Sequence, residues 1–192
     1  GLAARLQRAL VKRLYRYALG HRNAVVIFQN PDDLKLFVDN GLVDPAITVM
    51  IRGCGVDMHR FARQPEPAGE PVVVFPARIL GDKGVHEFIA AARGLTDRAR
   101  FVLVGRTDPD NPTDVGEAGI RAWAQEGIVT WQGFSDDMPS ALAQASVVCM
   151  PSYREGLPRV LIEAAAIGRP IVTTDVPGCR EIVRDGDNGL LV

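Results

Sequence analysis

The chain has 192 residues, which is enough for one domain or for one domain with part of another. Its hydrophobic fraction of 47% is typical of a globular protein, and its formal net charge of -1 does not favour binding to nucleic acid. Three cysteines without a Cys-x-x-Cys pair argue against a disulfide framework or a structural zinc site, so we expect buried, reduced thiols in a cytoplasmic protein.

The first predicted element is a basic amphipathic helix over residues 2–19, which Gly20 ends. Its apolar stripe consists of Leu2, Leu6, Leu10, Leu14 and Ala18. The cations of this region are Arg5, Arg8, Lys12, Arg13, Arg16 and Arg22, and no acid precedes Asp32. Two interpretations stay open. The helix is either a peripheral contact with the inner face of the plasma membrane or an ordinary surface helix of a domain.

Short apolar runs at residues 24–28 and 47–51 predict two strands, with a helix from Pro31 to Gly41 between them. The breakers Pro65, Pro67, Gly69 and Pro71 then make residues 63–71 the best linker candidate. We therefore expect residues 1–62 to be the remnant of an N-terminal domain and residues 72–192 to form a second domain.

Strands and helices alternate regularly in the second domain. The predicted strands cover residues 72–75, 101–104, 128–131, 147–150 and 171–173, and the predicted helices lie near residues 84–93, 115–126, 137–144, 158–167 and 178–184. Short apolar strands that alternate with helices predict an α/β fold, a Rossmann-like doubly wound parallel sheet. A further strand signal begins at Leu190, so we expect this domain to be incomplete at its C-terminus and the chain to be a fragment.

Standard catalytic signatures are mostly absent. No Gly-x-Gly-x-x-Gly occurs, so a dinucleotide cofactor is not expected, and P-loop, His-Glu-x-x-His and Gly-x-Ser-x-Gly sequences are missing as well. His21, His59 and His86 are scattered along the chain, which favours structural or exposed positions over catalytic ones.

The loop after strand 72–75 carries two cations. Arg78 and Lys83 bracket a turn that leads into a predicted helix, whose N-terminus offers free N–H groups and partial positive charge. A guanidinium fork and an ammonium group both suit phosphate. The pair is a candidate diphosphate clamp, and the alternative is that both side chains are exposed surface cations.

The loop after strand 147–150 carries two carboxylates. Gly156 permits a ligand to approach the backbone, and Pro158 fits the first turn of the next helix, with Glu155 just ahead of it. Glu163 lies among apolar neighbours inside that helix, so we expect it to be partly buried and to need partners such as sugar or ribose hydroxyls. In the alternative interpretation Glu163 pairs with a nearby arginine and Glu155 is a solvated cap.

Taken together, Arg78-x4-Lys83-Gly84 and Glu155-Gly156-x6-Glu163 resemble the donor site of the family 4 retaining glycosyltransferases. The other matching segments are Gly53–Asp57, Phe101–Gly105, Trp131–Phe134, Gly168–Val172 and Glu181–Gly189. The resemblance covers residues 24–192 and implies the GT-B fold, with residues 72–192 as the C-terminal domain that binds the nucleotide sugar.

The resemblance also implies roles for single residues. Arg78 and Lys83 would contact the donor diphosphate, Glu155 would face the donor sugar, and Glu163 would hold the ribose hydroxyls. Arg78, Lys83 and Glu155 are therefore the catalytic candidates. The remaining donor-binding candidates are Gly133 and Phe134 beside the base, and the backbone of Gly156, Leu157 and Pro158 beside sugar and phosphate.

The implied activity is transfer of a hexosyl group from a nucleotide sugar, preferably UDP-linked, to a glycan or lipid-linked acceptor. No metal cofactor is required, and the expected setting is bacterial surface polysaccharide biosynthesis, such as that of lipopolysaccharide. Because the family's site lies between two domains, we expect the fragment alone to be inactive. The alternatives are a nucleotide-sugar epimerase-like enzyme and a non-catalytic nucleotide-sugar-binding module on the same fold.

Overall fold

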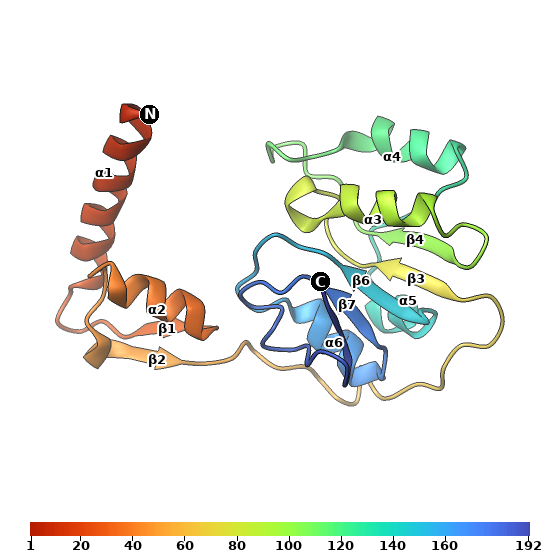
Figure 1. Cartoon of the computed structure of the whole chain (residues 1–192). Helices are drawn as coiled ribbons and strands as arrows, with labels where there is room; N and C mark the ends of the chain where they lie inside the picture. Colours follow the sequence, from red (N-terminus) through yellow and green to blue (C-terminus); the bar gives the residue numbers. More distant parts are fainter. The chain divides into compact units, whose positions relative to one another are not determined.

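The computed structural model describes the whole chain except the side chain of Leu2, and it divides into two compact units, Gly1–Cys54 and Gly55–Val192 (Figure 1). Cys179 is buried and Cys149 is half-buried, but Cys54 is exposed, so the expectation of buried thiols is wrong for Cys54. No described helix is long and apolar enough to cross a bilayer.

The first unit contains two helices and a pair of parallel strands. In chain order these are α1 (Leu2–Leu19), β1 (Val26–Phe28), α2 (Pro31–Asp39), the 3-10 turn η1 (Pro45–Ile47) and β2 (Thr48–Met50). The Asn30 side chain caps α2 by accepting a hydrogen bond from the Asp33 N–H at 2.7 Å. Phe37 of α2 packs edge-on against Phe28 and Tyr15, with ring centroids 5.3 and 5.2 Å apart.

Two cations of α1 bind the C-terminal end of α2. Lys12 Nζ donates to Asn40 Oδ1 at 2.7 Å, and Arg16 donates to the carbonyl oxygens of Gly41 and Asn40 at 2.8 and 3.1 Å. Positive charge at this end of a helix is favourable because the last carbonyls carry partial negative charge. These two cations therefore hold the helices of the first unit together.

The second unit is built on a six-stranded sheet in which neighbouring strands run parallel. Its strands are β3 (Val72–Phe75), β4 (Arg100–Val104), β5 (Thr130–Gly133), β6 (Val147–Met150), β7 (Ile171–Thr173) and β8 (Gly189–Leu191), in the spatial order β5-β4-β3-β6-β7-β8. The chain moves outward from β3 to β5 and then returns to place β6 on the other side of β3. The order therefore reverses between β3 and β6, where doubly wound sheets bind their ligands.

Helices cover both faces of this sheet, as Figure 1 shows. Residues of α5 (Met138–Ala143) and α6 (Arg159–Ile167) pack with Val72, Val74 and Val102. Residues of α3 (Val85–Arg93) and α4 (Gly116–Gln125) pack with Phe75 and Leu103 on the opposite face. Alternate residues of β3 and β4 thus enter two separate cores, and this arrangement confirms the predicted α/β fold.

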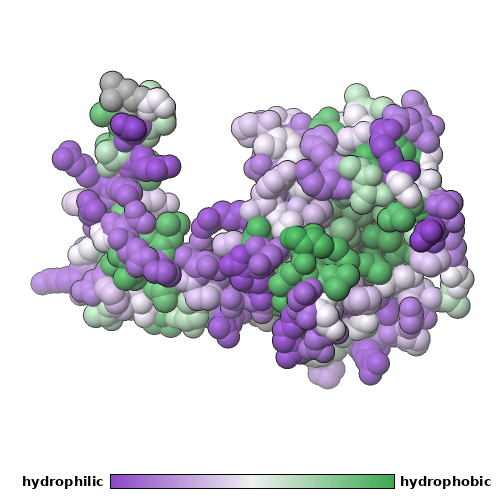
Figure 2. All heavy atoms as spheres, in the orientation of Figure 1, coloured by the Kyte–Doolittle hydropathy of each residue, from purple (hydrophilic) through white to green (hydrophobic). Residues whose placement is uncertain are grey.

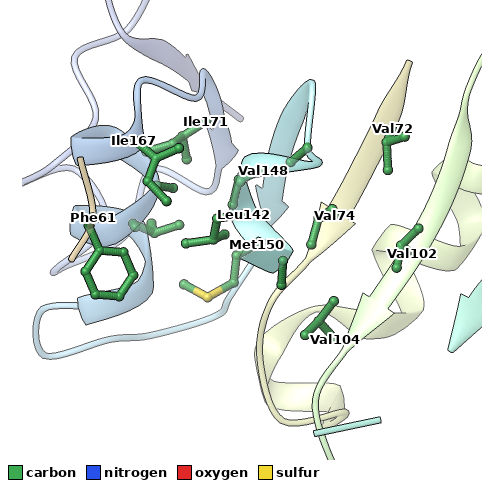
Figure 3. Close-up of a cluster of buried hydrophobic side chains, with 14 of the residues drawn as sticks. Phe61, Val72, Val74, Val102, Val104, Leu142, Val148, Met150, Ile167 and Ile171 are labelled. Carbon is green, nitrogen blue, oxygen red and sulfur yellow. The ribbon is translucent and has the colours of Figure 1, made fainter. Parts of the chain in front are cut away.

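Within the second unit, the segment before β3, residues 55–71, packs against the core of the sheet and its helices. Phe61 is 2% exposed and lies in the same cluster as Leu142, Met150 and Ile167 (Figure 3). Farther along, the Arg169 guanidinium is buried and donates to four carbonyl oxygens, those of Gln64, Pro65, Leu142 and Ala143. The first part of the predicted linker 63–71 is therefore fixed to α5 and to the turn after α6.

The prediction of a helix near residues 178–184 is wrong, because residues 177–182 form turns. Gly178 has a φ of 84°, and a Cβ there would lie 2.7 Å from the carbonyl oxygens of Glu155 and Gly156. The close approach of this loop to the loop after β6 requires a left-handed glycine, which interrupts a helix. The predicted strand 128–131 also begins two residues early, because the structure has β5 at Thr130–Gly133.

Candidate active site

The loops after β3 and β6 meet at the point where the strand order reverses. Asp82 O accepts a hydrogen bond from the Tyr153 N–H at 3.0 Å, and Ser152 Oγ lies 3.2 Å from the same oxygen. Gly84 has a φ of 79°, and a Cβ on it would lie 2.0 Å from Pro151 O. The two loops are therefore in backbone contact, and only glycine fits at this position.

Lys83 and Glu155 form an ion pair across these loops. Lys83 Nζ lies 2.6 Å from Glu155 Oε1, and the two side chains are 20% and 12% exposed. Ser152 Oγ donates to the same carboxylate oxygen at 2.7 Å, and Ser152 itself is fully buried. Because water is mostly excluded, this pair is screened less than an exposed one.

The loop after β7 supports this arrangement from behind. The Glu155 N–H donates to Pro177 O at 3.3 Å, and the Thr174 hydroxyl donates to Ser152 O. Together with the approach of Gly178 to Glu155, these contacts fix the backbone that carries the Glu155 carboxylate.

Glu163 is the fifth residue of α6 and is buried. Burial raises the pKa of its carboxyl above the ordinary value, whereas the positive charges of Arg159 and Arg60 lower it. Arg159 Nε lies 2.9 Å from Glu163 Oε1, so the carboxylate does pair with a nearby arginine. Pro158 occupies the N-cap position of α6 and provides no side-chain cap, so the first N–H groups of this helix are not capped by it.

Arg78 follows β3 and lines a separate hollow. Its guanidinium pairs with Asp108 at 2.5 Å, and its side chain is 48% exposed. The hollow has a volume of about 240 Å³ and lies beyond the ends of β3, β4 and β5, where Val104, Arg106, Phe134 and Met138 also line it. The Arg106 guanidinium lies 5.6 Å from the centroid of the exposed Phe134 ring.

Comparison with known proteins places the chain in a family. The family model described as glycosyl transferases group 1 matches residues 70–192. The chain belongs to this family. The predicted GT-B glycosyltransferase resemblance, with the six-stranded sheet in the C-terminal domain, is thereby confirmed.

Among group 1 glycosyltransferases, two similar proteins are informative. A Campylobacter jejuni protein is 30% identical over 99% of this chain, and it is named N,N'-diacetylbacillosaminyl-diphospho-undecaprenol alpha-1,3-N-acetylgalactosaminyltransferase. The crystal structure of Anabaena Alr3699/HepE in complex with UDP and glucose is 25% identical over 94% of this chain, with a TM-score of 0.77. The chain spans 52% of the first protein and 53% of the second.

A third relative is the lipopolysaccharide core biosynthesis glycosyltransferase LpsE of Rhizobium meliloti. It is 34% identical over 68% of this chain, and the chain spans 37% of its length.

The structure brings some of the predicted glycosyltransferase site residues together. Lys83 and Glu155 are in direct contact, and Arg78 lines the same hollow as Phe134, which follows Gly133 at the end of β5. Gly156, Leu157 and Pro158 form the backbone between Glu155 and α6. Arg78 and Glu163, however, each contact a different partner, namely Asp108 and Arg159.

Four residues near the site were not predicted from the sequence: Ser152, Asp108, Arg159 and Arg106. Arg159 carried a signal, because it stands four residues before Glu163 and such pairs meet on a helix. Asp108 and Arg106 come from the loop after β4, and their contacts depend on tertiary structure that the sequence pattern does not contain.

Proposed function

We propose that the protein carrying this chain transfers a hexosyl group, with retention of configuration, from a UDP-linked sugar to a lipid-linked or glycan acceptor. The setting that we propose is assembly of a bacterial surface polysaccharide, and this chain would supply the donor site. The observation that carries the proposal is the shielded Lys83–Glu155 pair at the point where the strand order reverses. The names of the Campylobacter, Rhizobium and Anabaena relatives support the choice of donor, acceptor and pathway.

The proposed chemistry follows from where the charges lie. Departure of the nucleotide builds negative charge on its diphosphate and positive character on the sugar. Lys83, Arg78 and the leading end of α6 would stabilise the diphosphate, so the reaction needs no metal ion in this proposal. Glu155 would face the sugar, where its carboxylate favours developing positive charge.

The ion pairs of Lys83 and Arg78 have a consequence for donor binding. Both Lys83 and Arg78 are held by carboxylates, those of Glu155 and Asp108. An entering diphosphate would take over these cations, and the hollow beside Arg78 and Phe134 would receive the base. Glu163 would accept hydrogen bonds from the ribose hydroxyls.

The K83A variant tests the donor site in the full-length protein. A hydrogen bond to a charged group contributes about 1.5–3 kcal/mol, so we expect UDP to bind about ten- to a hundredfold more weakly. Isothermal titration calorimetry with UDP, GDP and ADP measures the loss and also identifies the preferred nucleotide. R100A is the matched control, because Arg100 is exposed and begins β4, at the amino end of the strands and away from the carboxyl ends that carry the site.

K83A binding UDP as tightly as wild type would refute the donor site. A wild-type protein that binds UDP but transfers no labelled hexose to lipid-linked acceptor would refute the transferase activity instead.

We also propose that α1 contacts an anionic membrane surface. Leu6, Leu10 and Leu14 are 63%, 58% and 59% exposed, and Figure 2 shows hydrophilic residues along the same helix. Arg5, Arg8 and Arg13 are exposed as well, whereas Lys12 and Arg16 bind the end of α2. An apolar stripe flanked by cations is typical of helices that lie in the membrane interface.

Sedimentation with vesicles containing anionic lipid tests this membrane contact. Changing Arg5, Arg8 and Arg13 together to Gln should reduce binding strongly, since each basic residue near the surface contributes about 1 kcal/mol. The same change at Arg93, Arg98 and Arg100, which are exposed in the second unit, should leave binding unchanged. Equal losses in both triple variants would show that only net charge matters.

A further inference from the structure

Arg159 reaches inward from the rim of the site to a buried carboxylate. It is the first residue of α6, and its side chain is 60% exposed, whereas that of Glu163, one turn later, is 9% exposed. The distance of 2.9 Å from Arg159 Nε to Glu163 Oε1 makes this a direct ion pair. The ordinary i,i+4 pair is exposed on both sides, so this one is unusual in having one buried partner.

The pair opposes the effect of burial on the charge of Glu163. Burial favours the neutral carboxyl group, and the two cations that oppose burial are Arg159, from the same helix, and to a lesser extent Arg60, from the segment before β3. An ionised carboxylate makes hydrogen bonds roughly twice as strong as a neutral group does. The charge on Glu163 therefore matters to any hydroxyl that it receives.

The ion pair engages one oxygen of the Glu163 carboxylate. The 2.9 Å contact with Arg159 Nε is made by Oε1, and Oε2 is the oxygen outside this contact. It lies on the helix that begins directly after the loop of Glu155 and Gly156.

We propose that Arg159 is a positioning residue, which holds the Glu163 carboxylate charged and in place to accept hydrogen bonds from the vicinal hydroxyls of the donor's ribose. This inference rests on the proposed function and adds to it a residue that acts through Glu163. The competing role is direct contact of Arg159 with the donor phosphates. The two roles can be distinguished because only the positioning role depends on the ribose hydroxyls of the ligand.

The first test compares UDP with 2′,3′-dideoxy-UDP, which lacks both hydroxyls. We expect R159A in the full-length protein to weaken UDP about tenfold and to change the affinity for the dideoxy nucleotide less than about twofold. R159K should recover most of the UDP affinity because it restores the positive charge. Thermal unfolding of each variant checks that the fold is retained.

The second test is the pH dependence of the ratio of Kd values, R159A over wild type, for UDP. Without Arg159 the pKa of Glu163 rises further, so its carboxyl takes up a proton as the pH falls. The ratio should therefore be larger at mildly acidic pH and decrease towards alkaline pH. The protonation of UDP itself affects both Kd values equally and cancels in the ratio. The affinity of E163Q for UDP is expected to depend less on pH, because this variant carries no carboxyl group at position 163.

Equal weakening of UDP and dideoxy-UDP by R159A, or a ratio that is the same at every pH, would overturn the inference in favour of a phosphate contact or a structural role. A wild-type protein that binds no UDP would instead overturn the proposed function.

Discussion

At the scale of single residues, Glu163 combines a proposed binding role with a cost in stability. Among the described residues it is the only acid that is buried. Its pKa is raised by burial despite the opposing charges of Arg159 and Arg60, so the folded state holds a proton there more tightly than the unfolded state does. The corresponding stability is fully present below the ordinary pKa of 4.5 and is lost as the pH rises through the raised pKa.

The E163Q variant tests this linkage. Glutamine does not titrate, so the free energy of unfolding of E163Q minus that of wild type should increase as the pH rises from about 4 to 7. The same variant should bind UDP more weakly, and stability and donor binding would then change in opposite directions. Urea denaturation at several pH values measures the difference, and a difference that stays constant or falls with pH would contradict it.

At the scale of elements, the site depends on backbone contact between loops. The loop after β3 touches the loop after β6 at Gly84 and Pro151, and the loop after β7 touches the latter at Gly178 and Glu155. Each contact involves a glycine with positive φ. The relative positions of Lys83 and Glu155 are therefore set by glycines outside the ion pair.

The G84A and G127A variants separate two effects. Both glycines have left-handed φ, 79° and 74°, but a Cβ at Gly127 meets nothing within 4 Å, whereas one at Gly84 meets Pro151 O at 2.0 Å. G127A should lower the free energy of unfolding by about 1–2 kcal/mol, the cost of the left-handed backbone. G84A should lower it by about 1–3 kcal/mol more, because the loops must separate. Only G84A should also weaken UDP binding. The expectation would be contradicted if G84A and G127A lost the same stability in denaturation and the same UDP affinity in calorimetry.

At the scale of the whole molecule, the sheet could be predicted because its strands are short apolar runs between helices. The order of the strands, with its reversal between β3 and β6, was not predicted, because it depends on tertiary structure and not on local pattern. Residues 177–182 could not be predicted, because a left-handed glycine at Gly178 is required only by a distant loop.

The candidate site was predictable to a similar degree. Lys83 and Glu155 follow neighbouring strands, so the topology brings their loops to the same end of the sheet, and the loop contacts at Gly84 and Gly178 then place the two side chains. The partners of Arg78 and Glu163, namely Asp108 and Arg159, were not predicted. Asp108 lies on an irregular loop, whose contacts local pattern does not predict. For Glu163 the sequence suggested pairing with a nearby arginine but did not identify Arg159 as that residue.

The contacts of Phe61 and Arg169 bear on how domains of this family are recombined. A chimaera joined at residue 71 would import the sheet without the aromatic ring that fills its core and without two of the carbonyl groups that solvate a buried guanidinium. A chimaera joined between Cys54 and Gly55 would transfer the segment before β3 together with the rest of the second unit, against which it packs. The unit to exchange therefore begins at Gly55, ahead of the proline-rich residues 63–71 that the sequence alone predicts as the linker.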